Sequence, residues 1–143
     1  MGRILGIDFG ERRVGIALSD PTATIAQPLT TLTRRPGKRP PVEAVARIAE
    51  ENEATEIVLG LPLTPAGEES DWTRAVRAFG TRLAERTGLP VHYVDERLSS
   101  VRAERAVRSL GLPRRERERK ERVDRAAAVL ILQAYLDRRA ARD

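Results

Sequence analysis

Two apolar segments at the start of the chain, joined by a short polar turn, constrain the fold more than any other feature. Residues 3–9 and 13–19 are rich in Ile, Leu, Val and Gly, and Gly10-Glu11-Arg12 lies between them. Glycine tolerates the backbone conformations that a tight turn needs, so the pattern predicts a hairpin of two buried strands. Asp8 would then lie near the end of a core strand, where an ionised carboxylate is unfavourable unless a partner compensates its charge.

The rest of the sequence alternates between strand-like and helix-like patterns. A third strand is predicted over 24–33, where Pro28 indicates an edge position or a bend. Apolar runs and helical spacing predict the remaining elements, with strands over 56–60 and 91–95 and helices over 42–52, 72–86, 100–110 and 123–136. This order predicts an α/β fold in which a mixed sheet of about five strands carries helices on both faces. The chain is expected to form a single domain over 1–143.

The composition removes several classes of chemistry. The absence of cysteine excludes thiol nucleophiles, zinc–thiolate sites and disulfides. His92 is the only histidine, so a catalytic pair of histidines within one chain is impossible. Metal chemistry would rely on carboxylates, which suit hard ions such as Mg²⁺ or Mn²⁺. No apolar run approaches the ~20 residues that span a bilayer, so a cytoplasmic protein with no membrane partner is expected.

Three acidic positions stand where burial should be unfavourable. Asp8 ends the first strand, Asp95-Glu96 ends the strand over 91–95, and Asp124 lies at the start of the most apolar helix. Ligands of such sheets gather beyond the carboxyl ends of the parallel strands. Converging carboxylates repel one another, and a pair of divalent cations about 4 Å apart removes that conflict and hydrolyses phosphodiesters. The pattern therefore favours a metal-dependent nuclease site.

Each acid also has a structural explanation that the sequence leaves open. Asp8 could cap the following turn, Asp95 could cap a helix, and Asp124 could be an acid favoured by the helix dipole. Glu96 could simply pair with a nearby arginine. Adjacent residues of a strand point to opposite faces, so Asp95 and Glu96 cannot both join Asp8 if the strand continues through them. The spacing alone does not choose between them.

The charge of the chain favours a polyanionic partner. Lys and Arg number 26 against 21 Asp and Glu, which gives a net charge of +5 and a pI of about 10.6. The acid-free loop 34–40 is the first candidate for phosphate contacts, and the charge-dense stretch 114–125 is the second; the residues selected are Arg34, Arg35, Lys38, Arg39, Arg114 and Arg115. Segment 113–122 is expected to be mobile, and 114–125 could instead be a solvated, self-paired charged helix. Aromatic residues are few, so base stacking is not expected to dominate.

Four ordered motifs resemble one known family. GIDFGERRVGIALSD, IVLGLP, DERLSS and VDRAAAVLILQAYLD resemble, in order and spacing, the YqgF/RuvX family of RNase H-like proteins. The family is described as Holliday-junction-resolvase-like and as a nuclease of pre-16S ribosomal RNA. The resemblance implies an RNase H-like fold and assigns the catalytic, metal-binding acids to Asp8, Glu96 and Asp124. Asp95 would then face away and hold the turn before Leu98. The chain departs from the family at 64–67, which reads TPAG, and at Ser99-Ser100, where threonines are more usual.

The expected function is a Mg²⁺- or Mn²⁺-dependent endonuclease that processes the end of the pre-16S rRNA. A Holliday-junction resolvase of DNA recombination and repair is the first alternative, and it would require a homodimer because two symmetric sites are needed. A non-catalytic nucleic-acid-binding or transcription-linked factor is the second. An ATPase of the sugar-kinase or actin type also shares the first hairpin, but those enzymes need two such domains and 143 residues supply one.

Overall fold

The computed structural model describes residues 2–35, 37–99 and 116–142, with side chains for all of these except 116–125. The elements are β1 (Arg3–Phe9), β2 (Arg13–Ser19), β3 (Ala26–Thr33), α1 (Val42–Glu51), β4 (Ala54–Leu61), α2 (Asp71–Thr87), β5 (Val91–Asp95), the 3-10 turn η1 (Glu96–Leu98) and α4 (Glu116–Arg142). The predicted helix over 100–110 lies outside the described residues. None of the described helices is both long and apolar enough to cross a membrane.

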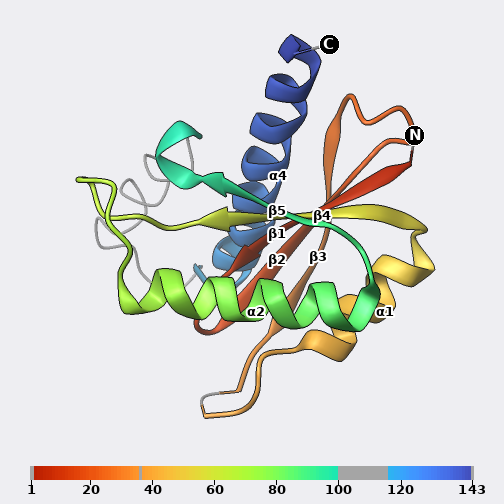
Figure 1. Cartoon of the computed structure of the whole chain (residues 1–143). Coiled ribbons are helices and arrows are strands. Elements are labelled where there is room, and N and C mark those ends of the chain that lie inside the picture. Colours follow the sequence, from red (N-terminus) through yellow and green to blue (C-terminus); the bar gives the residue numbers. More distant parts are fainter. Residues whose placement is uncertain (1, 36, 100–115, 143) are drawn as a thin grey trace.

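The strands form one mixed sheet in the order β3-β2-β1-β4-β5. β1 is antiparallel to β2, and β2 is antiparallel to β3, whereas β1, β4 and β5 run parallel. Helices α1 and α2 cover one face of the sheet, and α4 crosses the other (Figure 1). The predicted mixed sheet of five strands with helices on both faces is confirmed.

Side-chain alternation along the strands divides the core into two layers. One layer lies under α1 and α2 and includes Ile7, Leu59 and Phe79. The other lies under α4 and includes Val58 and Val94. Consecutive residues of a strand point to opposite faces, so neighbouring positions of β4 supply both layers. This is why the parallel strands read as continuous apolar runs rather than as alternating patterns.

Helix α4 approaches the sheet closely because β1 carries a glycine beneath it. A Cβ atom at Gly6 would lie 2.6 Å from Cβ of Leu132 and 3.3 Å from the carbonyl oxygen of Ala128. Gln133 fixes the same helix to the start of β3, since its side chain accepts a hydrogen bond from the backbone N–H of Ala26 at 2.9 Å and donates one to the carbonyl of Thr24 at 3.1 Å. The helix is thus held in one position across β1 and β3.

Two details of the sequence interpretation are decided by these elements. Pro28 lies on β3, at the end of the described sheet, and the β2–β3 register shifts opposite it, between Ile16 and Ala17. The edge position is confirmed. Helix α4 begins at Glu116, so the helical alternative for the charged stretch 114–125 holds from that residue onward. Glu, Arg and Lys are good helix formers, so a charge-dense run extends a helix instead of ending it.

We expect the substitution Gly6→Ala to destabilise the fold by about 1–3 kcal/mol, because the added methyl group overlaps Leu132 and must push α4 away from β1. Urea unfolding followed by circular dichroism measures this difference. A variant as stable as the parent would contradict the close packing of α4 on β1.

Candidate active site

Two buried carboxylates lie at the carboxyl-end edge of the parallel strands. Asp8 is the penultimate residue of β1, Glu96 follows the last residue of β5, and each is only 4% exposed. Asp8 has the same strand parity as Gly6, which faces α4, and Glu96 has the same parity as Val94, which also packs beneath α4. Both carboxylates therefore belong to the sheet face that α4 covers.

Gly60 lies on β4, between the two strands that position the acids. In the parallel register Ile7 pairs with Leu59 and Gly60 pairs with Val94, so Asp8 lies level with Gly60 on the neighbouring strand. A Cβ atom at Gly60 would lie 3.0 Å from Oε1 of Glu96. The carboxylate of Glu96 thus folds back over the glycine, toward the side where Asp8 stands.

The third predicted acid, Asp124, lies on α4, and its side chain is outside the described part of the structure. Helix α4 runs antiparallel to β4, since Tyr135 contacts Glu56 near the start of that strand and Ile131 contacts Gly60 near its end. The backbone of residue 124 is therefore on the part of α4 directed toward the edge that holds Asp8. Among the residues whose side chains are described, no three metal-ligating residues form a group.

Asp95 has a structural role on the opposite side of the strand end. Its carboxylate accepts a hydrogen bond from the backbone N–H of Arg97 at 2.9 Å and so caps η1. It also pairs with the Arg97 guanidinium at 2.7 Å, and this hydrogen bond raises the pKa of Arg97. Arg97 in turn packs over Gly67, whose φ of +84° places the loop after β4 against the guanidinium. The expectation that Asp95 holds the turn is confirmed.

The predicted basic loop contains one arginine with a different role. Arg34 donates a hydrogen bond to the carbonyl of Gly10 at 2.8 Å, and its guanidinium lies 4.5 Å from the ring centre of Phe9. Its Nε is buried and has no hydrogen-bond partner among the described residues. Burial lowers the pKa of Arg34, and the charge of Glu11 opposes this shift. Arg34 therefore fastens the β1–β2 turn to the end of β3.

The other basic candidates fall into two groups. Arg35, Lys38 and Arg39 are exposed in the irregular loop between β3 and α1, as the sequence predicts for a phosphate-contacting loop. Arg114 and Arg115 lie outside the described residues.

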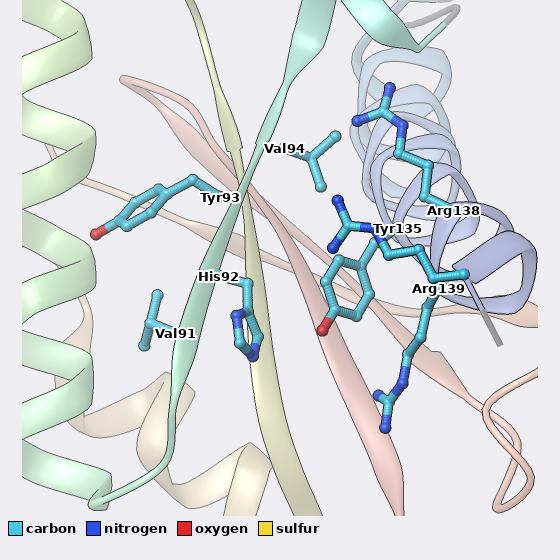
Figure 2. A pocket seen from close by; sticks show the side chains of 8 residues that line it. Val91, His92, Tyr93, Val94, Tyr135, Arg138 and Arg139 are labelled. Atoms are coloured by element: carbon cyan, nitrogen blue, oxygen red, sulfur yellow. The ribbon is translucent and has the colours of Figure 1, made fainter.

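A cleft of about 560 Å³ lies between β5 and the carboxyl-terminal part of α4, and the sequence interpretation did not find it. Figure 2 shows His92 on one side of the cleft and Tyr135 with the arginine side chains of α4 on the other. The only available signal was the closely spaced group of arginines that follows the apolar part of the last helix, at Arg138, Arg139 and Arg142.

A single carboxylate organises the inner part of this cleft. Oε1 of Glu56 accepts a hydrogen bond from the Tyr135 hydroxyl at 3.0 Å and lies 3.0 Å from Nε2 of His92, while Oε2 accepts one from Arg139 at 2.7 Å. Burial alone would raise the pKa of Glu56, but the hydrogen bonds from Arg139 and Tyr135 outweigh it and lower that pKa. Burial and the bond to Glu56 raise the pKa of Tyr135.

The sheet order, the parallel strands and the two inward-facing acids define the class of protein: the chain has an RNase H-like fold, the fold of RuvC resolvases. Thermus thermophilus RuvC, solved in complex with a Holliday junction substrate, is similar over 98% of this chain and 97% of that chain, with a TM-score of 0.58 and 14% sequence identity. At that identity the likeness shows the fold alone.

The family follows from sequence similarity. The family described as "RuvX: Holliday junction resolvase" matches residues 2–138, and the chain belongs to it. A protein of Koribacter versatilis, named "Putative pre-16S rRNA nuclease", is 48% identical over 138 residues, which cover 96% of this chain and 88% of that protein. A protein of the same name from Chloroflexus aggregans is 45% identical over 95% of this chain and 94% of its own length. The chain is accordingly a nuclease, a hydrolase that acts on nucleic acid.

We expect Asp95→Ala to lower the free energy of unfolding by about 1–2 kcal/mol, because the substitution removes the cap of η1 together with a charged hydrogen bond to Arg97. The matched control is Asp71→Ala, since Asp71 also pairs with an arginine but its side chain is 99% exposed. Thermal unfolding of both variants measures the contrast. Equal losses in the two variants would contradict an anchoring role for Asp95.

We also expect Glu56→Gln to reduce stability at neutral pH by about 1 kcal/mol, because the Glu56 carboxylate is stabilised in its charged form. A lowered pKa contributes stability above the ordinary carboxyl pKa, and this contribution is lost as the pH falls through the folded-state value. The difference in the free energy of unfolding between Glu56→Gln and the parent should therefore become smaller below about pH 4. Urea unfolding from neutral pH to below about pH 4 measures this difference, and Glu85→Gln, at an exposed position, is the control. A difference that persists in acid would contradict a stabilising role for the charged Glu56.

Proposed function

We propose that the chain is a divalent-metal-dependent endonuclease that hydrolyses phosphodiester bonds in structured nucleic acid, with the end of the pre-16S rRNA as its substrate. Asp8, Glu96 and Asp124 are the proposed catalytic acids and metal ligands. The observation that carries the proposal is the pair of acids at the edge of the sheet. Asp8 and Glu96 are each 4% exposed and share one sheet face, on either side of Gly60, whose missing side chain lets the Glu96 carboxylate lie close to β4.

The residues present fit a hard divalent cation. Two carboxylates buried near each other repel and lose hydration, and a cation between them offsets both effects. Carboxylate oxygens are the ligands that Mg²⁺ and Mn²⁺ prefer, and the chain has no cysteine and a single histidine to offer a softer metal. The direction of α4 would add the third carboxylate, from Asp124, on the same side.

The protein supplies position and the metal supplies reactivity. When bound, divalent ions activate a water molecule and stabilise the charge that develops on the leaving oxygen. Asp8 lies on a central strand and Glu96 on a capped turn, so a rigid backbone positions both carboxylates. Gly60, on the strand between them, lets the Glu96 carboxylate lie close to β4. The exposed cations Arg35, Lys38 and Arg39 would bind substrate phosphates, and Arg114 and Arg115 are further candidates for this role.

The relatives favour the rRNA substrate, and the family description favours a second one. The Koribacter and Chloroflexus proteins carry the pre-16S rRNA name over nearly the full length of this chain. The family is described as a Holliday junction resolvase, and a resolvase would need a homodimer to present two symmetric sites. Cleavage of an rRNA precursor requires only one site.

The first experiment replaces Asp8 by Asn, which keeps the size of the side chain and removes its charge. We expect cleavage to fall at least about 100-fold, equal to about 2.7 kcal/mol of transition-state stabilisation, while folding and nucleic-acid binding persist. Asp71→Asn is the control, because the same change on a fully exposed side chain should leave the rate unchanged. Calorimetry with Mn²⁺ should show weaker metal binding in Asp8→Asn alone. An unchanged rate in Asp8→Asn would reject the site.

The second experiment compares an rRNA precursor with a four-way DNA junction, each with Mg²⁺ and with Mn²⁺. We expect the precursor to be cleaved faster, and the mass in solution to show whether one chain or two is the active form. Faster cleavage of the junction by a dimer would replace the rRNA proposal by the resolvase alternative.

A further inference from the structure

The cleft between β5 and α4 extends along β5 as far as Val94, two residues before Glu96. β5 begins beside the cleft at Val91 and ends at Asp95, immediately before Glu96. His92 precedes Glu96 by four residues, about 13 Å of strand, and the Glu96 carboxylate folds back over Gly60, which pairs with Val94, so the two side chains are closer than that. Arg138 reaches the segment after Glu96, with Nη2 3.5 Å from the carbonyl of Leu98. A ligand that entered the site at Glu96 could therefore follow β5 into the cleft.

The cleft presents positive charge in a repeated arrangement. Arg138 and Arg142 are four residues apart on α4 and therefore lie on the same side of the helix, one turn from each other. Arg139 lies beside them and is held by Glu56 at 2.7 Å. Glu56 offsets one of the three arginine charges, so the wall of the cleft keeps a positive excess that suits successive phosphates.

The cleft also presents a stacked pair of rings. The ring centres of His92 and Tyr135 are 5.3 Å apart, and the ring planes differ by 23°. Glu56 contacts both rings at 3.0 Å and fixes the pair before any ligand arrives. The His92 side chain is 40% exposed, so the stack has an accessible member. A positive groove beside a fixed aromatic ring is the combination with which proteins bind unpaired nucleic acid.

We propose that this cleft binds an unpaired stretch of the nucleic-acid substrate, with phosphates on Arg138 and Arg142 and a base stacked on the ring of His92. The proposal rests on the nuclease function proposed above and adds the form of the substrate: an unpaired flank beside the cleaved bond. The pair of arginines together with an exposed ring favours nucleic acid over an acidic peptide, and the peptide is one outcome of the test below.

The arginines are tested by fluorescence anisotropy with a labelled, unstructured RNA of about ten nucleotides, without divalent metal. Each lost phosphate contact should reduce the magnitude of the slope of log affinity against log salt by about 0.7. At 0.1 M salt this corresponds to a roughly fivefold lower affinity. The double variant Arg138→Gln with Arg142→Gln should therefore bind about 25-fold more weakly, with a slope lower by about 1.4. The control is Arg47→Gln with Arg82→Gln, which removes the same charge from exposed positions of α1 and α2.

The ring is tested separately with the same RNA. His92→Ala should weaken binding by about 5- to 150-fold, and His92→Phe should restore most of it, because phenylalanine keeps a stacking face without the imidazole. A fully paired RNA of equal length should bind the parent, His92→Ala and His92→Phe equally. An acidic peptide that displaces the RNA equally well from the parent and from His92→Ala would overturn the assignment to nucleic acid.

Failure of this inference can be told apart from failure of the nuclease function. If the arginine and histidine variants bind the RNA as tightly as the parent and as the control variant at Arg47 and Arg82, the cleft is not the binding site. This conclusion does not depend on the result for Asp8→Asn. If they lose binding while Asp8→Asn leaves cleavage unchanged, the cleft is retained and the proposed metal site is rejected. Cleavage of a fully paired substrate should be insensitive to His92→Ala, whereas cleavage beside an unpaired flank should show a raised KM with kcat unchanged.

Discussion

The packing of α4 against a glycine-bearing sheet face is the contact on which the rest of the structure depends. Gly6 on β1 and Gly60 on β4 offer no side chains to this face, and the positions that a Cβ would take are within 2.6 Å of Leu132 and 2.5 Å of Ile131, respectively. The helix can therefore lie close to the strands along much of its length. That approach buries the α4 layer of the core, and it also encloses the space over Gly60 beside Glu96. One constraint thus serves both folding and the candidate site.

Helix α4 also determines which charged residues meet at each end of the sheet face that it covers. Because α4 is antiparallel to β4, its early part is directed toward Asp8 and Glu96, and its last turns meet Glu56 and His92. Asp8 and Glu96 thus lie at one end of the face, and Glu56, which accepts hydrogen bonds from Arg139 and Tyr135, lies at the other. Glu56 neutralises only Arg139, so the other arginines of the cleft give it a positive charge.

The strand and helix order could be predicted from the sequence because apolar runs and helical spacing are local signals. The choice between Asp95 and Glu96 could not be made from spacing, since it depends on where β5 ends. The structure shows that Asp95 caps η1 and stops the strand, which leaves Glu96 to fold back over Gly60. The cleft was missed because its partners are distant in sequence: Tyr135 and Glu56 are 79 residues apart and meet only when α4 docks. Arg34 was counted as a surface cation for the same reason, because its contact with Phe9 requires the folded hairpin.

The distance between the acids and the cleft resolves an electrostatic conflict that any nuclease of this kind faces. Carboxylates that hold a cation repel an approaching polyanion, while arginines placed directly against them would compete with the cation for the same oxygens. Glu56, which binds Arg139, precedes Gly60 by four residues of β4, about 13 Å along the strand. Arg139 is thus held by its own carboxylate at the far end of this face, and the chain can carry a net charge of +5 while keeping an acidic centre for the metal.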